Sequence, residues 1–276
     1  EREIGGKNIR IETGKIARQA AGAVVVSSGD TVVLAAALVG PPREGVDFFP
    51  LTVDYREKTY AAGKFPGGFF KREARPTNKE ILTMRMIDRP LRPMFPAGYI
   101  DEVLIQSMVL ASDTKNDPDI LAMIGAAAAL SISQIPFEGP SASCRVGYAD
   151  GKYILNPTLE DLEYCTMEMV LAGHKDAINM IEVGSLEVSE EVVAGGVEFG
   201  HKAIIQVCAM IQELVNKAGK PKEWNAPPPT DKLLSDLRKT YASDLRAARA
   251  TSGKQNRYKA VNDIYKTAKG IYAPEG

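Results

Sequence analysis

The sequence predicts an α+β core followed by a small all-α segment. Its first 220 residues combine short apolar runs, some of them joined by tight turns, with a few long helical patterns. A Pro-rich stretch then separates this part from a helical tail. With 276 residues and 45% hydrophobic residues, the chain has room for one or two domains and can bury a sizeable core.

Short β-rich runs supply the predicted strands. Ser28-Gly29-Asp30 connects two apolar runs as a tight turn, and Ala149-Asp150-Gly151-Lys152 connects two more. Both are typical of hairpins. The predicted strands are residues 8–12, 23–27, 31–39, 48–55, 102–112, 144–148, 153–155, 167–172 and 177–183.

The first predicted helix covers residues 78–89. Thr77 and Glu80 have the spacing of a capping box, so the helix is expected to begin near Asn78. It is expected to stop before Pro90, because the residue before a proline disfavours helical geometry. Arg92 would then lie in an extended Arg-Pro-Leu-Arg-Pro segment.

Two further helices are expected to pack on the sheet. One begins with Asp117 as its cap and Pro118 at its first position, and runs to residue 133. The other runs from about residue 189 to residue 218, with Gly219 as a C-terminal cap. Glycines at 195, 196 and 200 are unfavourable inside a helix, so they indicate the close approach of a neighbour or a break.

Composition divides the chain into a core at residues 1–220, a semi-rigid linker at 221–230 and a helical domain at 231–276 that is expected to be incomplete. The tail holds ten basic and five acidic residues. A solvated helix surface is the simplest interpretation of that charge.

Residues 63–96 form the most basic stretch of the core. The stretch has eight cationic and three acidic side chains, a net +5, although the whole chain has a net charge of −1. Such a concentration is typical of a site for a polyanion. Gly67-Gly68 gives the backbone freedom to turn just before Phe69 and Phe70.

An aromatic pair beside cations suits single-stranded nucleic acid, because rings stack on bases and cations meet phosphates. A hydrophobic loop anchor with a solvated rim is the competing interpretation. On the helix that follows, Arg85 and Arg89 are four residues apart and share one side. The candidate residues for binding nucleic acid are Phe69, Phe70, Lys71, Arg72, Arg75, Arg85, Arg89 and Arg92.

Other chemistries have little support in the sequence. Cys144, Cys165 and Cys208 are widely spaced, as expected for reduced cysteines in a cytosol-like compartment. The chain has only two histidines, so a histidine-based metal site or a Ser-His-Asp triad is not expected. It has no apolar run of the ~18–20 residues that span a membrane, and no visible signal peptide.

Long motifs resemble one family. The segments GKFPGGFFKREARP and IDRPLRPMFP, together with DFFPLTVDY at 47–55 and NDPDILAMIGA at 116–126, are similar to the first core of polynucleotide phosphorylases. The resemblance covers roughly residues 1–220. It implies a ribonuclease PH-like core, a second such core elsewhere in the full-length protein, and assembly into a homotrimeric ring with a central channel.

The resemblance also implies an activity for the full-length protein. This is 3′-to-5′ degradation of single-stranded RNA with phosphate as the attacking group, together with the reverse polymerisation. Mg²⁺ and inorganic phosphate would bind to the second core. The protein would be cytoplasmic, or located in the matrix of an organelle in a eukaryotic source. Its partners would belong to an RNA-degradation assembly. The Phe69–Phe70 pair would line a narrow point of the channel.

The first core is expected to lack catalytic and metal-binding residues. At the expected phosphate site stand Asp117, Pro118 and Asp119, whose carboxylates repel phosphate and whose proline lacks an amide donor. At the family's two metal-binding aspartates and its lysine stand Leu162, Glu168 and Val170. The 276-residue portion alone is therefore expected to be inactive. The alternatives are a non-catalytic RNA-binding ring subunit of exosome type and a stand-alone α+β enzyme for a small anion.

Overall fold

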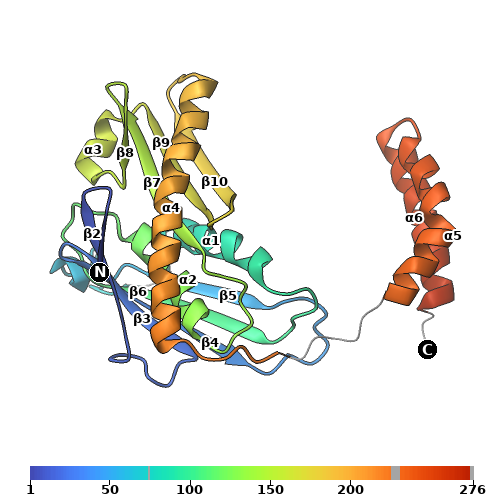
Figure 1. Cartoon of the computed structure of the whole chain (residues 1–276), viewed down its shortest axis with the longest axis horizontal. Helices are drawn as coiled ribbons and strands as arrows, with labels where there is room; N and C mark the ends of the chain where they lie inside the picture. Colours follow the sequence, from blue (N-terminus) through green and yellow to red (C-terminus); the bar gives the residue numbers. More distant parts are fainter. Residues whose placement is uncertain (74, 225–230, 274–276) are drawn as a thin grey trace. The chain divides into compact units, whose positions relative to one another are not determined.

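The computed structural model describes residues 1–73, 75–224 and 231–273. The chain divides into two compact units, Glu1–Asn225 and Ala226–Gly276 (Figure 1). None of the described helices is long and apolar enough to cross a membrane.

A six-stranded mixed sheet forms one layer of the first unit. Its order is β1-β2-β3-β4-β6-β5, with antiparallel neighbours except for the parallel pair β5 and β6. The turn at Ser28-Gly29-Asp30 joins β3 and β4 as predicted. The strands are β1 (Arg2–Ile4), β2 (Lys7–Thr13), β3 (Gly22–Ser28), β4 (Thr31–Gly40), β5 (Leu51–Arg56) and β6 (Glu102–Ala111).

A second sheet has four antiparallel strands in the order β10-β9-β7-β8. The predicted second hairpin joins β7 and β8. Its strands are β7 (Ala142–Ala149), β8 (Lys152–Leu155), β9 (Met167–His174) and β10 (Ala177–Ser185), and the short helix α3 (Leu159–Tyr164) precedes β9.

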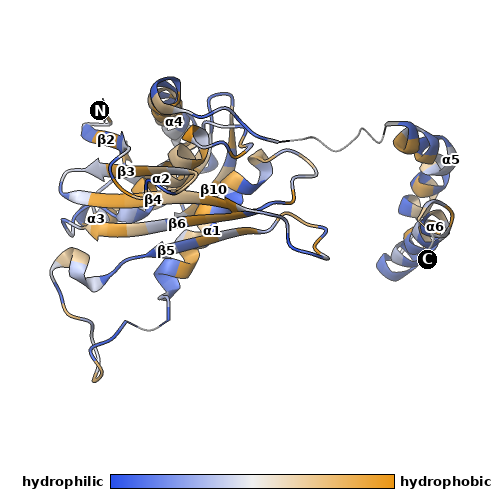
Figure 2. Cartoon of the chain, turned by 90° about the horizontal axis from the view of Figure 1, so that it is seen from below, coloured by the Kyte–Doolittle hydropathy of each residue, from blue (hydrophilic) through white to orange (hydrophobic). Residues whose placement is uncertain are grey.

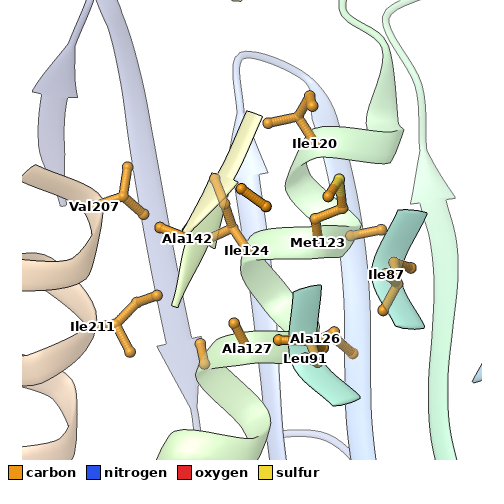
Figure 3. Close-up of a cluster of buried hydrophobic side chains, with 14 of the residues drawn as sticks. Ile87, Leu91, Ile120, Met123, Ile124, Ala126, Ala127, Ala142, Val207 and Ile211 are labelled. Carbon is orange, nitrogen blue, oxygen red and sulfur yellow. The ribbon is translucent and has the colours of Figure 1, made fainter. Parts of the chain in front are cut away.

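Helix α2 (Pro118–Ile132) lies at the centre of the core, and every one of its residues is buried. Asp117 caps it and Pro118 opens it, as the sequence predicted. Its small residues let the helix approach the first sheet closely. A Cβ at Gly125 would lie 2.9 Å from the Ala35 Cβ atom. Figure 3 shows Ile124 and Ala127 of α2 among side chains from α1, β7 and α4.

Helix α4 (Glu190–Ala218) is continuous and packs on β7 and β9. The glycines inside it mark close approach rather than a break. A Cβ at Gly200 would lie 2.4 Å from Leu171 and 2.9 Å from Val146. The helix therefore tolerates glycine because the second sheet presses against it there.

Helix α1 (Asn78–Leu91) corrects one prediction. The Thr77–Glu80 capping box is present, but the helix continues through Pro90 and passes directly into the short 3-10 helix η2 (Arg92–Met94). Pro90 and Leu91 are buried, and Asn179 Nδ2 donates a hydrogen bond to the Pro90 carbonyl. Packing of this last turn outweighs the local preference, so Arg92 is helical rather than extended.

The second unit is a helical hairpin of α5 (Asp231–Ala250) and α6 (Lys254–Tyr272). Among its described side chains, only Ala248 is fully buried. Residues 225–230 of the predicted linker lie outside the described residues. The residues just before them belong to the core surface. Lys222 Nζ donates to the carbonyls of Leu130 and Ser133 at the end of α2, and the Trp224 ring lies 6.5 Å from the Tyr99 ring.

Candidate nucleic-acid interface

The predicted aromatic pair lies on a loop that extends away from both sheets (Figure 2). We call residues 64–76 the phenylalanine loop. It follows the 3-10 helix η1 (Thr59–Ala62) and leads into α1. Gly68 has φ 75° and Lys71 has φ 50°, so the backbone turns on both sides of the pair.

The rings of this loop are open to solvent. Phe69 is 93% exposed, Phe70 is 80% exposed, and Phe65 on the same loop is 89% exposed. The Phe69 and Phe70 centroids are 5.5 Å apart and their planes meet at 84°. A hydrophobic anchor would be buried, whereas both rings of the pair are exposed in this chain.

Four cations lie on the same loop as the exposed rings. Among the residues that the structure describes, no side-chain partner lies within hydrogen-bond or salt-bridge distance of Lys64, Lys71, Arg72 or Arg75, and all four are exposed. Unpaired cations beside π-faces are the combination that single-stranded nucleic acid needs.

Glu73 fixes the base of the phenylalanine loop. Its carboxylate accepts hydrogen bonds from the Thr59 amide at 2.6 Å and the Thr59 hydroxyl at 2.9 Å, and it pairs with Lys58 Nζ at 2.8 Å. The bond from Lys58 and those from Thr59 lower the pKa of Glu73 to about 2. Glu73 is thus ionised at neutral pH and ties the loop to η1.

The predicted arginines of α1 and η2 differ in their partners. Arg92 pairs with Asp88 and donates to the carbonyls of Phe49 and Leu51. Asp88 is therefore paired with Arg92. Arg89 pairs with Glu182 of β10. Within the described part of the chain, Arg85 has no such partner.

Arg85 and Arg89 line an open cleft of about 530 Å³ between α1 and strands β9 and β10. Glu168, Val170 and Glu182 form part of its opposite wall. No described residue of the phenylalanine loop lines it. The predicted RNA-binding residues thus separate: five lie on the projecting loop, Arg85 and Arg89 line a cleft with charges of both signs, and Arg92 lies on η2 against Asp88.

Charged side chains of the protein itself fill the N-terminus of α2. Arg145 donates to Asp117 at 3.1 Å and to Asp119 at 2.5 Å. Lys79 pairs with Asp117 at 2.9 Å and with Glu57 at 3.0 Å. These residues form what we call the Arg145 network.

The centre of the Arg145 network is buried, whereas Lys79 at its edge is half exposed. The Arg145 side chain is 7% exposed and that of Asp119 is 2% exposed. Burial raises the pKa of Asp119 to about 6. Burial also acts to raise the pKa of Asp117, but Arg145 and Lys79 outweigh it, so that pKa lies below its usual value. An incoming phosphate would meet two carboxylates already matched by cations.

The structure places the three positions matched to the family's metal and lysine residues on α3 and β9. Glu168 lies 3.1 Å from Arg145 Nε, close enough for an ionic contact but not aligned as a hydrogen bond. Val170 is buried and Leu162 is on α3. Among the described residues, no group of three His, Cys, Asp or Glu side chains could hold a metal ion.

Two sequence profiles identify the family. The profile of the 3′ exoribonuclease family, domain 1, matches residues 5–136, and that of domain 2 of the same family matches residues 139–203. The chain belongs to the 3′ exoribonuclease family.

Individual relatives agree with the predicted resemblance. The chain is 49% identical over 275 residues to the polyribonucleotide nucleotidyltransferase of Rhodopirellula baltica, covering 100% of this chain and 36% of that protein. It is 49% identical over 278 residues to the protein of the same name from Nitrobacter winogradskyi, covering 100% of this chain and 39% of that one. The chain thus spans well under half the length of these relatives. The resemblance to polynucleotide phosphorylases is confirmed.

A structural neighbour supports the fold. The crystal structure of rice (Oryza sativa) Rrp46 matches with a TM-score of 0.62 at 18% identity, covering 78% of this chain and 98% of that one. The predicted ribonuclease PH-like α+β core is therefore confirmed.

Three parts of these sites were not found from sequence. Phe65 was not among the predicted residues, although it lies four residues before the aromatic pair. Glu73 and Arg145 carry no motif of their own, because their roles depend on partners 14 and 28 residues away.

Proposed function

We propose that the full-length protein to which this chain belongs is a phosphorolytic 3′-to-5′ exoribonuclease. It would degrade single-stranded RNA with inorganic phosphate, release nucleoside diphosphates, and run in reverse as a polymerase. The identity to polyribonucleotide nucleotidyltransferases over the whole chain supports this proposal.

In this proposal the present core holds RNA and does no chemistry. The Arg145 network is the observation that supports the lack of catalysis. Without it, the N-terminus of α2 would offer its amides to a phosphate. Here Asp117 and Asp119 occupy that place and Arg145 compensates them. These residues do not fit phosphate or Mg²⁺, so both are assigned to a second core.

The phenylalanine loop is the proposed RNA contact. Exposed rings offer stacking surfaces worth ~1–3 kcal/mol per base, and this contact requires unpaired bases. Lys71, Arg72 and Arg75 would meet the flanking phosphates. The loop therefore favours single strands over duplexes.

Assembly and location follow the same proposal. We expect a homotrimeric ring in the cytoplasm that takes part in RNA processing and mRNA degradation. Light scattering of the full-length protein tests the ring, and a stable monomer would contradict it.

Product analysis tests the activity. The full-length protein is incubated with oligoadenylate and Mg²⁺, with and without phosphate, and the released nucleotides are separated. ADP that forms only with phosphate is the expected result. Release of AMP without phosphate would show hydrolysis and overturn the proposal.

The absence of a catalytic set among this core's described residues also fits a non-catalytic ring subunit of exosome type. The mass of the natural gene product separates the two candidates. A product long enough for a second core favours the enzyme, and one that ends soon after the helical hairpin favours the subunit.

A further inference from the structure

Helix α6 has a face that the hairpin does not use. Lys254, Tyr258, Asn262 and Lys266 follow one another at four-residue spacing, so they form one row along the helix. Gln255, Lys259 and Asp263 form the adjacent row. All seven line a shallow hollow on the second unit.

The aromatic rings of this face are exposed. Tyr258 is 73% exposed, and Tyr265, two turns further on, is 64% exposed. Both rings are thus more than half exposed, whereas Val261 and Ile264 of the same helix are half-buried.

The cations of this face are unpaired. In the described part of the chain, no acidic group lies within salt-bridge distance of Lys254, Lys259 or Lys266. Asp263 is the one acid lining the hollow, against three lysines. The net charge is positive over a length of about 18 Å from residue 254 to residue 266.

We infer that this lysine–tyrosine face of α6 is a second binding surface for single-stranded RNA. Its lysines complement phosphates, its tyrosines offer π-faces to bases, and Asn262 and Gln255 can donate and accept hydrogen bonds. The choice of RNA as the ligand rests on the proposed function, whereas the surface itself does not.

Helix α5 provides a matched control. Lys232, Lys239 and Arg246 share its outward face at seven-residue spacing. They remove the same charge when changed to glutamine, but no aromatic ring as exposed as Tyr258 accompanies them on α5.

The test uses the full-length protein and oligoadenylate, with affinity measured at several salt concentrations. The Lys254→Gln, Lys259→Gln, Lys266→Gln triple variant should lower the slope of log affinity against log salt by about 2, since each phosphate contact on a single strand contributes ~0.7. Tyr258→Ala should weaken binding at least about fivefold, the lower limit for stacking, and Tyr258→Phe should retain it. Melting temperatures verify folding.

Photo-cross-linking separates this inference from the proposed function. A thiouridine-containing strand should cross-link to a peptide containing Tyr258. Cross-linking only at the phenylalanine loop, or equal salt slopes for the α5 and α6 triple variants, would overturn the inference and leave the proposed activity intact. Hydrolysis without phosphate, with the cross-link to Tyr258 present, would overturn the proposed activity alone.

Discussion

The phenylalanine loop and the Arg145 network both contain cationic side chains, but these are exposed and unpaired in the loop and matched by carboxylates in the network. The loop exposes three phenylalanines and leaves its four cations unpaired within the described residues. The network buries an arginine between two aspartates and leaves no cation of its own free.

This difference indicates where a polyanion can bind. A cation that already contacts a buried carboxylate must lose that contact before it can hold a phosphate, which costs several kcal/mol. A cation surrounded by water loses little. The loop is therefore the available site, although the network stands at a helix N-terminus, where an anion would ordinarily be favoured.

The largest expected effect is on stability. Arg145→Met would leave Asp117 and Asp119 buried without their main partner, so the free energy of unfolding should fall by ~3–5 kcal/mol. Chemical denaturation measures this. Adding Asp117→Asn and Asp119→Asn should recover part of the loss. Arg85→Met, at an exposed site without a described partner, should stay within ~0.5 kcal/mol. Equal losses for Arg145→Met and Arg85→Met would contradict the distinction.

The second effect is on binding. The Phe69→Ala, Phe70→Ala double variant of the full-length protein should lose ~1–3 kcal/mol of binding free energy for each base that no longer stacks. Its melting temperature should hardly change, because both rings are exposed. RNA titration checks the expected loss of affinity, and thermal melting checks the unchanged stability. A large drop in melting temperature with unchanged affinity would place the rings in a core instead.

A smaller effect is expected on the salt dependence of RNA binding. Arg72→Gln with Arg75→Gln should reduce the slope of log affinity against log salt by up to ~1.4, or ~0.7 for each lost phosphate contact. Lys152→Gln with Lys175→Gln, at exposed positions of the second sheet, provides the charge-matched control. Equal changes in slope for the two pairs would contradict phosphate binding by Arg72 and Arg75.

The smallest effect is on loop order. Glu73→Gln removes the ionic contact with Lys58, so the phenylalanine loop should be cut faster by chymotrypsin while the global melting temperature stays the same. The pKa of Glu73 is depressed to about 2. Its contribution to loop order is thus complete at neutral pH, declines as the pH falls below the ordinary value of 4.5, and is lost once the pH has fallen through about 2. The difference between the two proteins should be constant from pH 6 to pH 8, and a difference that disappears in this range would contradict the anchor.

Local sequence signals predicted much of the fold. The Thr77–Glu80 and Asp117–Pro118 helix starts and both hairpin turns were correct because neighbouring residues determine them. Short elements were missed. Strand β1 has only three residues, and α3 has six although Thr158 and Asp161 form a capping box. The end of α1 was wrong because burial of Pro90 and Leu91, a long-range effect, decided it.

The candidate site was likewise predictable where its residues are neighbours in sequence, and not where they pair over long distances. The loop's rings and cations are contiguous in sequence, so their composition alone indicated a polyanion. The pairing of Arg89 with Glu182, 93 residues away, was not visible from any local pattern. The same holds for Arg145, which lies between two aspartates only because β7 packs beside α2.

One measurement tests most directly the claim that this core holds RNA without cleaving it. The 276-residue chain is incubated with oligoadenylate that carries a photoreactive base, together with Mg²⁺ and phosphate. Cross-links at residues 65–72 and no ADP are the predicted result. Steady ADP release that survives removal of contaminating host enzyme would contradict the account.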